Sequence, residues 1–222
     1  MKITKELLRE KGACAAGYRD FLKEFPKEKY PDGVEYQDLL DCCAEKGFSY
    51  GSWLLSVFGR TDDVRKVDGD LITEKSIIFA GRLEVSGSIE AGEGIEAGCG
   101  IKAGRGVKAG CGIKAGEGIE AGCGIEAGCG IEAGRGVKAG CGIEAGWGIE
   151  AGLGIKAGEG IEAGCGIEAG CGIEAGEGIE AGCKFGIYAG LRVRITSEYR
   201  KIIAKTKPEN IMCGEFVEAE NE

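Results

Sequence analysis

The sequence predicts a mainly β protein: a three-sided β-helix solenoid with a small helical domain before it and a short β cap after it. A six-residue unit, Ile-Glu-Ala-Gly-x-Gly, fills its aliphatic position at sixteen successive places from Ile89 to Ile179. An even period returns every aliphatic residue to one face of a strand, whereas a helix would spread them around its surface. The glycine period is not three and only 3 prolines occur, which excludes collagen.

The repeat also predicts the geometry of one coil. Hexad solenoids bend three times per coil, so one coil takes about 18 residues and stacks on the next at about 4.8 Å. The isoleucine and alanine of each unit then point inward, and the Glu or Lys between them points outward. Two glycines per unit let the backbone bend sharply, and they place the x residue at an exposed corner, where a charged side chain is not buried.

The first part of the chain is expected to be helical. Thr4 can cap a helix over 5–11 that ends at Gly12, and apolar periodicity predicts further helices over 13–25, 36–46 and 53–58. The whole chain divides into a small α-helical domain (1–59), a charged connector (60–69), an N-terminal β cap (70–88), the hexapeptide-repeat β-helix (89–190), and a C-terminal β cap and tail (191–222).

The end of the repeat is marked by a change of register. After Gly182 the next aliphatic position arrives two residues late. Alternating residues then predict strands over 192–196, 201–205 and 212–218. These segments are expected to cover the open sheet edge at that end, as the helical domain and residues 70–85 do at the other.

The unit Ile125-Glu126-Ala127-Gly128-Cys129-Gly130 resembles the hexapeptide-repeat β-helix family, whose pattern is an aliphatic residue, Gly/Ala/Glu/Asp, two free positions, a small residue and a free position. Units with Glu, Arg or Trp at x depart from it. The resemblance implies a left-handed three-sided coil. Bactofilin-type cytoskeletal proteins, with short β-helix repeats of the opposite hand, are the second resemblance.

No catalytic, cofactor-binding or metal-binding residue is expected. The best-known enzymes of the hexapeptide family are acyltransferases with a histidine base, and this chain has no histidine. That absence also removes Ser-His-Asp and Cys-His catalysis, and no phosphate-binding loop motif is present. The net charge of -9 argues against direct binding of nucleic acid. The charged N-terminus and the lack of a long apolar run predict a cytoplasmic protein with no membrane contact.

The cysteines largely follow the repeat. With 18-residue coils, Cys111 stacks on Cys129, Cys123 on Cys141, and Cys165 on Cys183. We interpret cysteine here as a small residue at a tight corner, with reduced thiols. A disulfide or a shared soft metal is the alternative for stacked pairs.

Two outward columns become acidic toward the C-terminal end. One reads Glu90, Lys108, Glu126, Glu144, Glu162, Glu180, and the next reads Glu96, Lys114, Glu132, Glu150, Glu168, whereas the third column is mixed. Charged faces keep such a rod soluble, which is the plain interpretation. The specific interpretation is partner binding, for which the candidates are Glu126, Glu144, Glu162, Glu180, Glu132, Glu150, Glu168 and Trp147.

The sequence therefore predicts a non-enzymatic interaction protein. Its concrete form is an inhibitor of the phage or mobile-element type, whose acidic faces mimic nucleic acid and bind a protein partner such as a nucleic-acid-binding protein. A self-assembling scaffold of the bactofilin kind, and hence a homo-oligomer, is the alternative. An atypical hexapeptide acyltransferase is a remote third.

Overall fold

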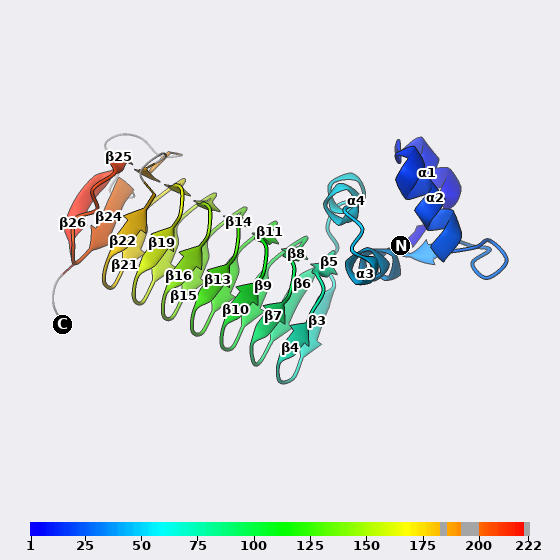
Figure 1. Ribbon diagram of the computed structural model, residues 1–222, viewed down its shortest axis with the longest axis horizontal. Helices are drawn as coiled ribbons and strands as arrows, with labels where there is room; N and C mark the ends of the chain where they lie inside the picture. The colour runs from blue at the N-terminus through cyan, green and yellow to red at the C-terminus, as the bar shows by residue number, and fades with distance from the viewer. Residues whose placement is uncertain (183–185, 192–199, 220–222) are drawn as a thin grey trace.

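The structure is a computed structural model and describes residues 1–182, 186–191 and 200–219. Three parallel sheets wrap around one narrow core and form a β-solenoid of about 8 turns, with four helices at its N-terminal end (Figure 1). The predicted fold class is confirmed. Among the described residues, no helix has both the length and the apolar character needed to cross a membrane.

The sheets are named here by their number of strands. The seven-strand sheet contains β4 (Leu71–Thr73), β7 (Ile89–Ala91), β10 (Val107–Ala109), β13 (Ile125–Ala127), β16 (Ile143–Ala145), β19 (Ile161–Ala163) and β22 (Ile179–Ala181). The eight-strand sheet contains β5 (Ile77–Phe79), β8 (Ile95–Ala97), β11 (Ile113–Ala115), β14 (Ile131–Ala133), β17 (Ile149–Ala151), β20 (Ile167–Ala169), β23 (Ile187–Ala189) and β25 (Ile211–Cys213). The nine-strand sheet contains β3 (Val64–Val67), β6 (Arg82–Val85), β9 (Ile101–Ala103), β12 (Ile119–Ala121), β15 (Val137–Ala139), β18 (Ile155–Ala157), β21 (Ile173–Ala175), β24 (Lys201–Ala204) and β26 (Glu215–Glu218).

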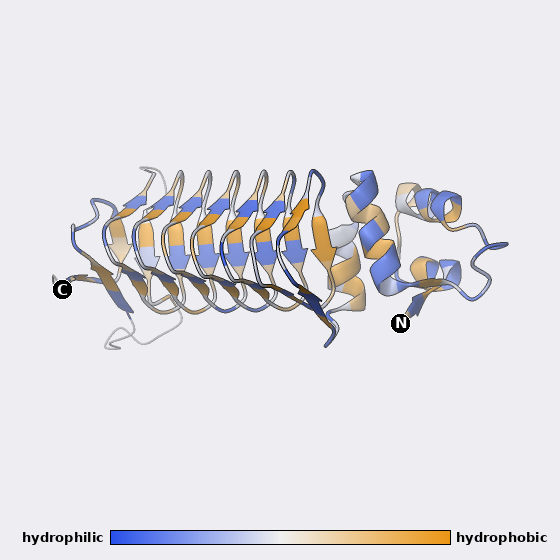
Figure 2. Cartoon of the chain, turned by 90° about the horizontal axis from the view of Figure 1, so that it is seen from below, coloured by the Kyte–Doolittle hydropathy of each residue, from blue (hydrophilic) through white to orange (hydrophobic). Residues whose placement is uncertain are grey.

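Neighbouring strands of each sheet lie 18 residues apart in the repeat, as the sequence predicts. Val107 of β10 pairs with Ile125 of β13, and the same register continues along the rod. In each repeat strand the outer two residues are buried and the middle one faces outward, as in β13, where Ile125 is 1% exposed. Figure 2 shows the resulting alternation of apolar and polar residues along the coils. The core is thus a stack of isoleucine and alanine layers.

The first glycine of each unit is needed for space rather than for an unusual backbone angle. A Cβ atom on Gly128 would lie well under 3.0 Å from the carbonyl oxygen of Gly110 in the preceding coil. Neither Gly128 nor Gly130 has a positive φ. The second glycine is less constrained, because a Cβ on Gly130 would lie 3.3 Å from the carbonyl oxygen of Gly148. Close stacking of the coils, rather than the backbone freedom that we expected, therefore requires glycine at the first of these positions.

The solenoid begins earlier than the repeat does. The segment 60–69, which we expected to be a charged connector, contains strand β3, and β3 pairs in parallel with β6. Within 70–88, strands β4, β5 and β6 pair with β7, β8 and β9 as ordinary neighbours in the stack. The coils before the repeat thus have the same architecture, although Leu, Val and Phe replace the repeat residues there.

Beyond the repeat, the sheets continue with altered spacing. Ile167 pairs with Ile187, an offset of two residues more than in the regular coils, as the late aliphatic position predicts. The predicted strand over 201–205 is observed as β24, and the segment 212–218 contributes β25 and β26. The strand expected over 192–196 lies outside the described residues.

The helical domain contains α1 (Lys5–Glu10), α2 (Ala15–Glu24), α3 (Tyr36–Lys46) and α4 (Gly51–Phe58), together with the antiparallel pair β1 (Lys2–Ile3) and β2 (Val34–Glu35). The hydroxyl of Thr4 accepts a hydrogen bond from the Leu7 N–H, which confirms the predicted cap. The pair β1–β2 was not predicted, because two-residue strands leave no periodic signal.

Helix α3 covers the N-terminal edge of the eight-strand sheet. The Gln37 side chain donates to the Ile78 carbonyl at 2.8 Å and accepts from the Ala80 N–H at 3.1 Å, which satisfies one backbone group of the edge strand β5 and one of the residue that follows it. Ile78 and Ala80 also belong to the apolar core of the helical domain. The domain therefore caps this sheet, as edge strands require.

An ion-pair cluster strengthens this junction. Arg60 and Arg82 contact the two carboxylate oxygens of Glu117 at 3.1 and 2.9 Å. Glu117 occupies an x position of the repeat, and Glu93, at another, accepts a hydrogen bond from Ser76 at 2.9 Å. Some of the charged x residues are thus explained by contacts with the non-repetitive start of the solenoid.

At the C-terminal end, the seven-strand sheet stops two coils before the nine-strand sheet. Its last strand, β22, faces the segment 205–210, where Asn210 donates a side-chain hydrogen bond to the Ala181 carbonyl at 3.3 Å. Pro208 in this segment is buried and has no N–H to donate to a sheet. The segment therefore covers the edge without extending the sheet.

Candidate partner-binding faces

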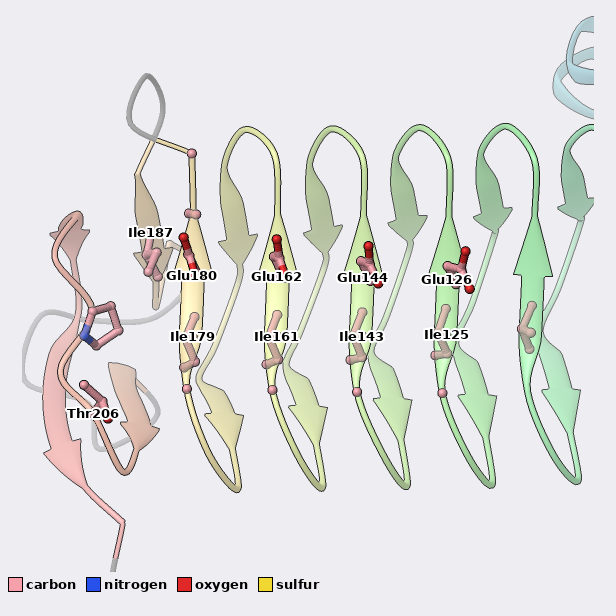
Figure 3. Close-up of a pocket in the computed structure, with 18 of the residues that line it drawn as sticks. Ile125, Glu126, Ile143, Glu144, Ile161, Glu162, Ile179, Glu180, Ile187 and Thr206 are labelled. Carbon is pink, nitrogen blue, oxygen red and sulfur yellow. The ribbon is translucent and has the colours of Figure 1, made fainter.

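The first predicted acidic column lies along the outer face of the seven-strand sheet. The in-register pairs Glu126↔Glu144 and Glu162↔Glu180 place these side chains in one row on consecutive coils (Figure 3). The row lines an open groove of about 1070 Å³ that is bounded at its C-terminal end by Thr206–Asn210. The sequence thus correctly predicts which carboxylates share a face.

Two of the predicted carboxylates are neutralised within the rod. Lys108 contacts Glu126 at 2.7 Å, and Lys114 contacts Glu132 at 3.0 Å in the eight-strand sheet. The hydrogen bond that Lys108 donates to Glu126, and then the negative charge of Glu126, raise the pKa of Lys108. Glu126 and Glu132 are therefore less available to a cationic partner than the column alone suggests.

The remaining five carboxylates have no cation within 4.0 Å among the residues that the structure describes. They are Glu144, Glu162 and Glu180 on the seven-strand sheet and Glu150 and Glu168 on the eight-strand sheet. Backbone pairing holds like charges in register on coils about 4.8 Å apart. Like charges directly opposite each other in a sheet are destabilising. These two faces therefore carry a local cost that a cation would relieve.

The nine-strand sheet differs from the other two. Its outward residues pair with each other, with Lys138 at 3.8 Å from Glu120 and Lys156 at 2.6 Å from Glu174. This face consequently has little uncompensated charge, as its mixed column predicts.

Trp147 lies at the corner between the two acidic faces. It follows β16 of the seven-strand sheet and precedes β17 of the eight-strand sheet, and 67% of its surface is exposed. Its neighbours along the chain in these strands include Glu144 and Glu150. An exposed indole ring beside carboxylates suits the side chain of arginine or lysine, which can stack on the ring and pair with the acids.

The predicted stacking of cysteines is observed for two pairs. The Cys129 N–H donates to the Cys111 carbonyl at 3.0 Å, and the Cys141 N–H donates to the Cys123 carbonyl at 3.2 Å. All four residues are free thiols. In the third predicted pair, Cys183 lies outside the described residues. No cluster of three or more metal-ligating side chains is found in 1–182, 186–191 and 200–219.

The helical domain contains a feature that the sequence did not reveal. A small apolar cavity of about 130 Å³ lies among α1, α2, α3 and α4, lined in part by Leu8, Phe21, Cys43 and Trp53. Burial raises the pKa of the Cys43 thiol to about 12. Because cavities depend on side-chain packing, periodicity alone gives no signal for this one.

One comparison with known proteins gives a match. A family model described as the YdhT N-terminal domain matches residues 1–61, which span the helical domain and not the repeat. No curated protein and no solved structure matches the chain.

Proposed function

We propose that the protein is a non-enzymatic interaction protein whose two acidic faces bind a basic groove on a nucleic-acid-binding protein, in the manner of a phage or mobile-element inhibitor. The observation that supports this most directly is the row of carboxylates at Glu144, Glu162 and Glu180, which have no ion-pair partner in the part of the chain that the structure describes. On the nine-strand sheet the same repeat pairs Lys138 with Glu120 and Lys156 with Glu174, so a row of like charges is not a necessary result of the repeat.

Rigidity supports this proposal. Glu144 and Glu162 extend from the middle of strands whose backbones are hydrogen-bonded to coils on both sides, so little order is lost when a partner binds. A rigid row of like charges produces a field that attracts a cationic surface and speeds its association. Binding of this kind is expected to weaken as salt is added.

Trp147 supplies the apolar part of the interface. Large aromatic residues provide much of the binding energy at protein interfaces, with polar groups around them. Trp147 is exposed at the corner where the two acidic faces meet, so an arginine-rich or lysine-rich groove can contact both faces and the indole ring together. We place this function in the cytoplasm and regard the repeat as kin to the hexapeptide-repeat β-helices.

The test is affinity capture from cytosol with two charge-matched variants. Glu144→Gln/Glu162→Gln/Glu180→Gln removes three carboxylates of the row on the seven-strand sheet. The control Glu84→Gln/Glu120→Gln/Glu174→Gln removes three that are paired with lysines on the nine-strand sheet. The proposal expects a captured nucleic-acid-binding protein to be lost with the first variant and kept with the second. Equal capture by both variants contradicts it.

If the acidic faces mimic nucleic acid, the partner must bind this protein and nucleic acid at the same site. Duplex DNA or RNA added to the complex should displace the protein in proportion to the affinity of the partner for nucleic acid, and salt should weaken both complexes in parallel. If a ternary complex persists at saturating nucleic acid, the two proteins interact, but the acidic faces do not mimic nucleic acid.

A self-assembling scaffold is the second candidate, on a different observation. Large apolar side chains are exposed near both ends of the solenoid, at Ile72 in β4 and Met212 in β25 (Figure 1). The coverage of β5 by Gln37 and of β22 by Asn210 argues against a simple extension of the sheets. Sedimentation of the purified chain over a range of concentrations distinguishes the two, since only the scaffold predicts large assemblies of this chain alone.

A further inference from the structure

Two pairs of thiols are held one above the other at corners of the solenoid. Cys111 and Cys129 lie at the corner between the seven-strand and eight-strand sheets, and Cys123 and Cys141 lie at the corner between the nine-strand and seven-strand sheets. Cys111 and Cys123 are exposed, and their partners are half-buried. In both pairs the two cysteines lie one coil apart, so the two pairs offer a ligand the same spacing.

The spacing of the coils decides what each pair can bind. Stacked residues are about 4.8 Å apart. A disulfide needs the two Cβ atoms at about 3.5–4.5 Å and the two sulfurs at about 2.05 Å, so parallel side chains one coil apart would have to be drawn together. A zinc–thiolate bond is about 2.3 Å long, and two metal–thiolate bonds of about that length in line span about 4.6 Å. One ion between the two sulfurs therefore fits the coil spacing better than a direct bond.

A carboxylate flanks each pair, and Arg105 precedes Cys123 by one coil, with a backbone hydrogen bond of 3.0 Å joining them. Glu93 precedes Cys111 by one coil, and Glu159 follows Cys141 by one coil, with backbone hydrogen bonds of 3.1 and 3.3 Å joining them.

We propose that each stacked pair, Cys111 with Cys129 and Cys123 with Cys141, binds one monovalent copper ion between its two sulfur atoms. Soft thiolate ligands select Cu(I), whereas structural zinc takes four ligands, and each stacked pair offers two sulfurs. Binding exchanges two S–H bonds for two S–Cu bonds. Each ion of charge +1 therefore releases two protons, and no oxidant or reductant is consumed.

The test is a Cu(I) titration of the full reduced chain, without oxygen, against a coloured Cu(I) chelator. We expect Cys111→Ser and Cys123→Ser each to remove one tightly bound copper, and the double variant to remove two. Cys171→Ser is the matched control, because Cys171 follows the repeat but stacks on Leu153, whose carbonyl accepts its N–H at 2.8 Å. X-ray absorption of the copper-loaded protein should show two sulfur neighbours, and the pH of a weakly buffered sample should fall by two protons per ion.

Three results would overturn the proposal. Copper that the chelator removes completely from the wild-type chain would show that neither pair is a site. Equal loss of copper in Cys171→Ser would show that separate thiols bind it without pairing. The third result is disulfide formation without copper binding. If mild oxidation by glutathione disulfide lowers the mass by four hydrogens, the change maps to both pairs, and the reduced chain takes up no copper, the pairs form disulfides instead. Circular dichroism of each variant confirms that the solenoid is intact.

Discussion

The two glycines of a repeat unit should respond very differently to the same substitution. Gly128→Ala places a methyl group against the Gly110 carbonyl, well under 3.0 Å from its oxygen, whereas Gly130→Ala places one 3.3 Å from the Gly148 carbonyl oxygen. Both residues have negative φ angles, so alanine is allowed at both by backbone conformation. The pair thus isolates the effect of coil stacking.

The magnitude follows from what must move. To admit the methyl group at 128, the two coils must separate locally, which lengthens the hydrogen bonds from Gly128 N–H to Ala109 and from Cys129 N–H to Cys111, both 3.0 Å. Each such bond contributes about 0.5–1.5 kcal/mol, and forced overpacking costs about 1–3 kcal/mol. We therefore expect Gly128→Ala to cost about 2–4 kcal/mol. Gly130→Ala needs a shift of a few tenths of an ångström, which the reduced entropy of the unfolded chain, worth about 0.4–1 kcal/mol, should largely offset.

Guanidinium unfolding followed by circular dichroism gives the stability of each variant, and amide hydrogen exchange locates the effect. Because coils contact only their neighbours, faster exchange should be confined to the amides around 128 and 129 and to the adjacent coils. Equal destabilisation by the two substitutions, or a larger effect at 130, would refute the argument from coil stacking.

Three further predictions concern the helical domain. Gln37→Ala removes the side-chain partner of the Ile78 carbonyl and the Ala80 N–H. We therefore expect the free energy of unfolding to fall by about 2 kcal/mol and aggregation through β5 to increase. An unchanged free energy of unfolding would contradict the capping role. Burial, and then the charge of Glu96, raise the pKa of Tyr36 above 10.0. Because the unfolded state loses this proton first, stability should fall as the pH rises above about 10, and Tyr36→Phe should reduce that fall. Burial raises the pKa of Cys43 to about 12, so iodoacetamide at pH 8 should label exposed Cys14 well before Cys43, which mass spectrometry can measure.

The sequence predicts the solenoid well because its signal repeats. The six-residue period requires strands, and the pairing of Val107 with Ile125 is the 18-residue coil that three bends predict. The bounds of a helix could also be predicted where residues close in sequence mark its ends, as at Thr4 and over Tyr36–Lys46. Strand β3 was missed because Val64–Val67 carries Arg and Lys in place of repeat residues, and only its contact with β6 makes it a strand.

The candidate faces were predicted in part. Register alone places Glu144, Glu162 and Glu180 in one row, because the coil period fixes which residues stack. The pairing of Lys108 with Glu126 depends on side-chain conformations, which the period does not fix. The same holds for Glu117, whose two arginine partners come from outside the repeat.

Photo-crosslinking tests the proposed function most directly. Trp147→p-benzoylphenylalanine places a crosslinker at the corner between the acidic faces, and Lys138→p-benzoylphenylalanine places the same group on the neutralised nine-strand sheet. The account predicts that, in cytosol, the first variant crosslinks to one basic nucleic-acid-binding protein and the second does not. Crosslinks from both positions to the same protein, or to none from position 147, would contradict it.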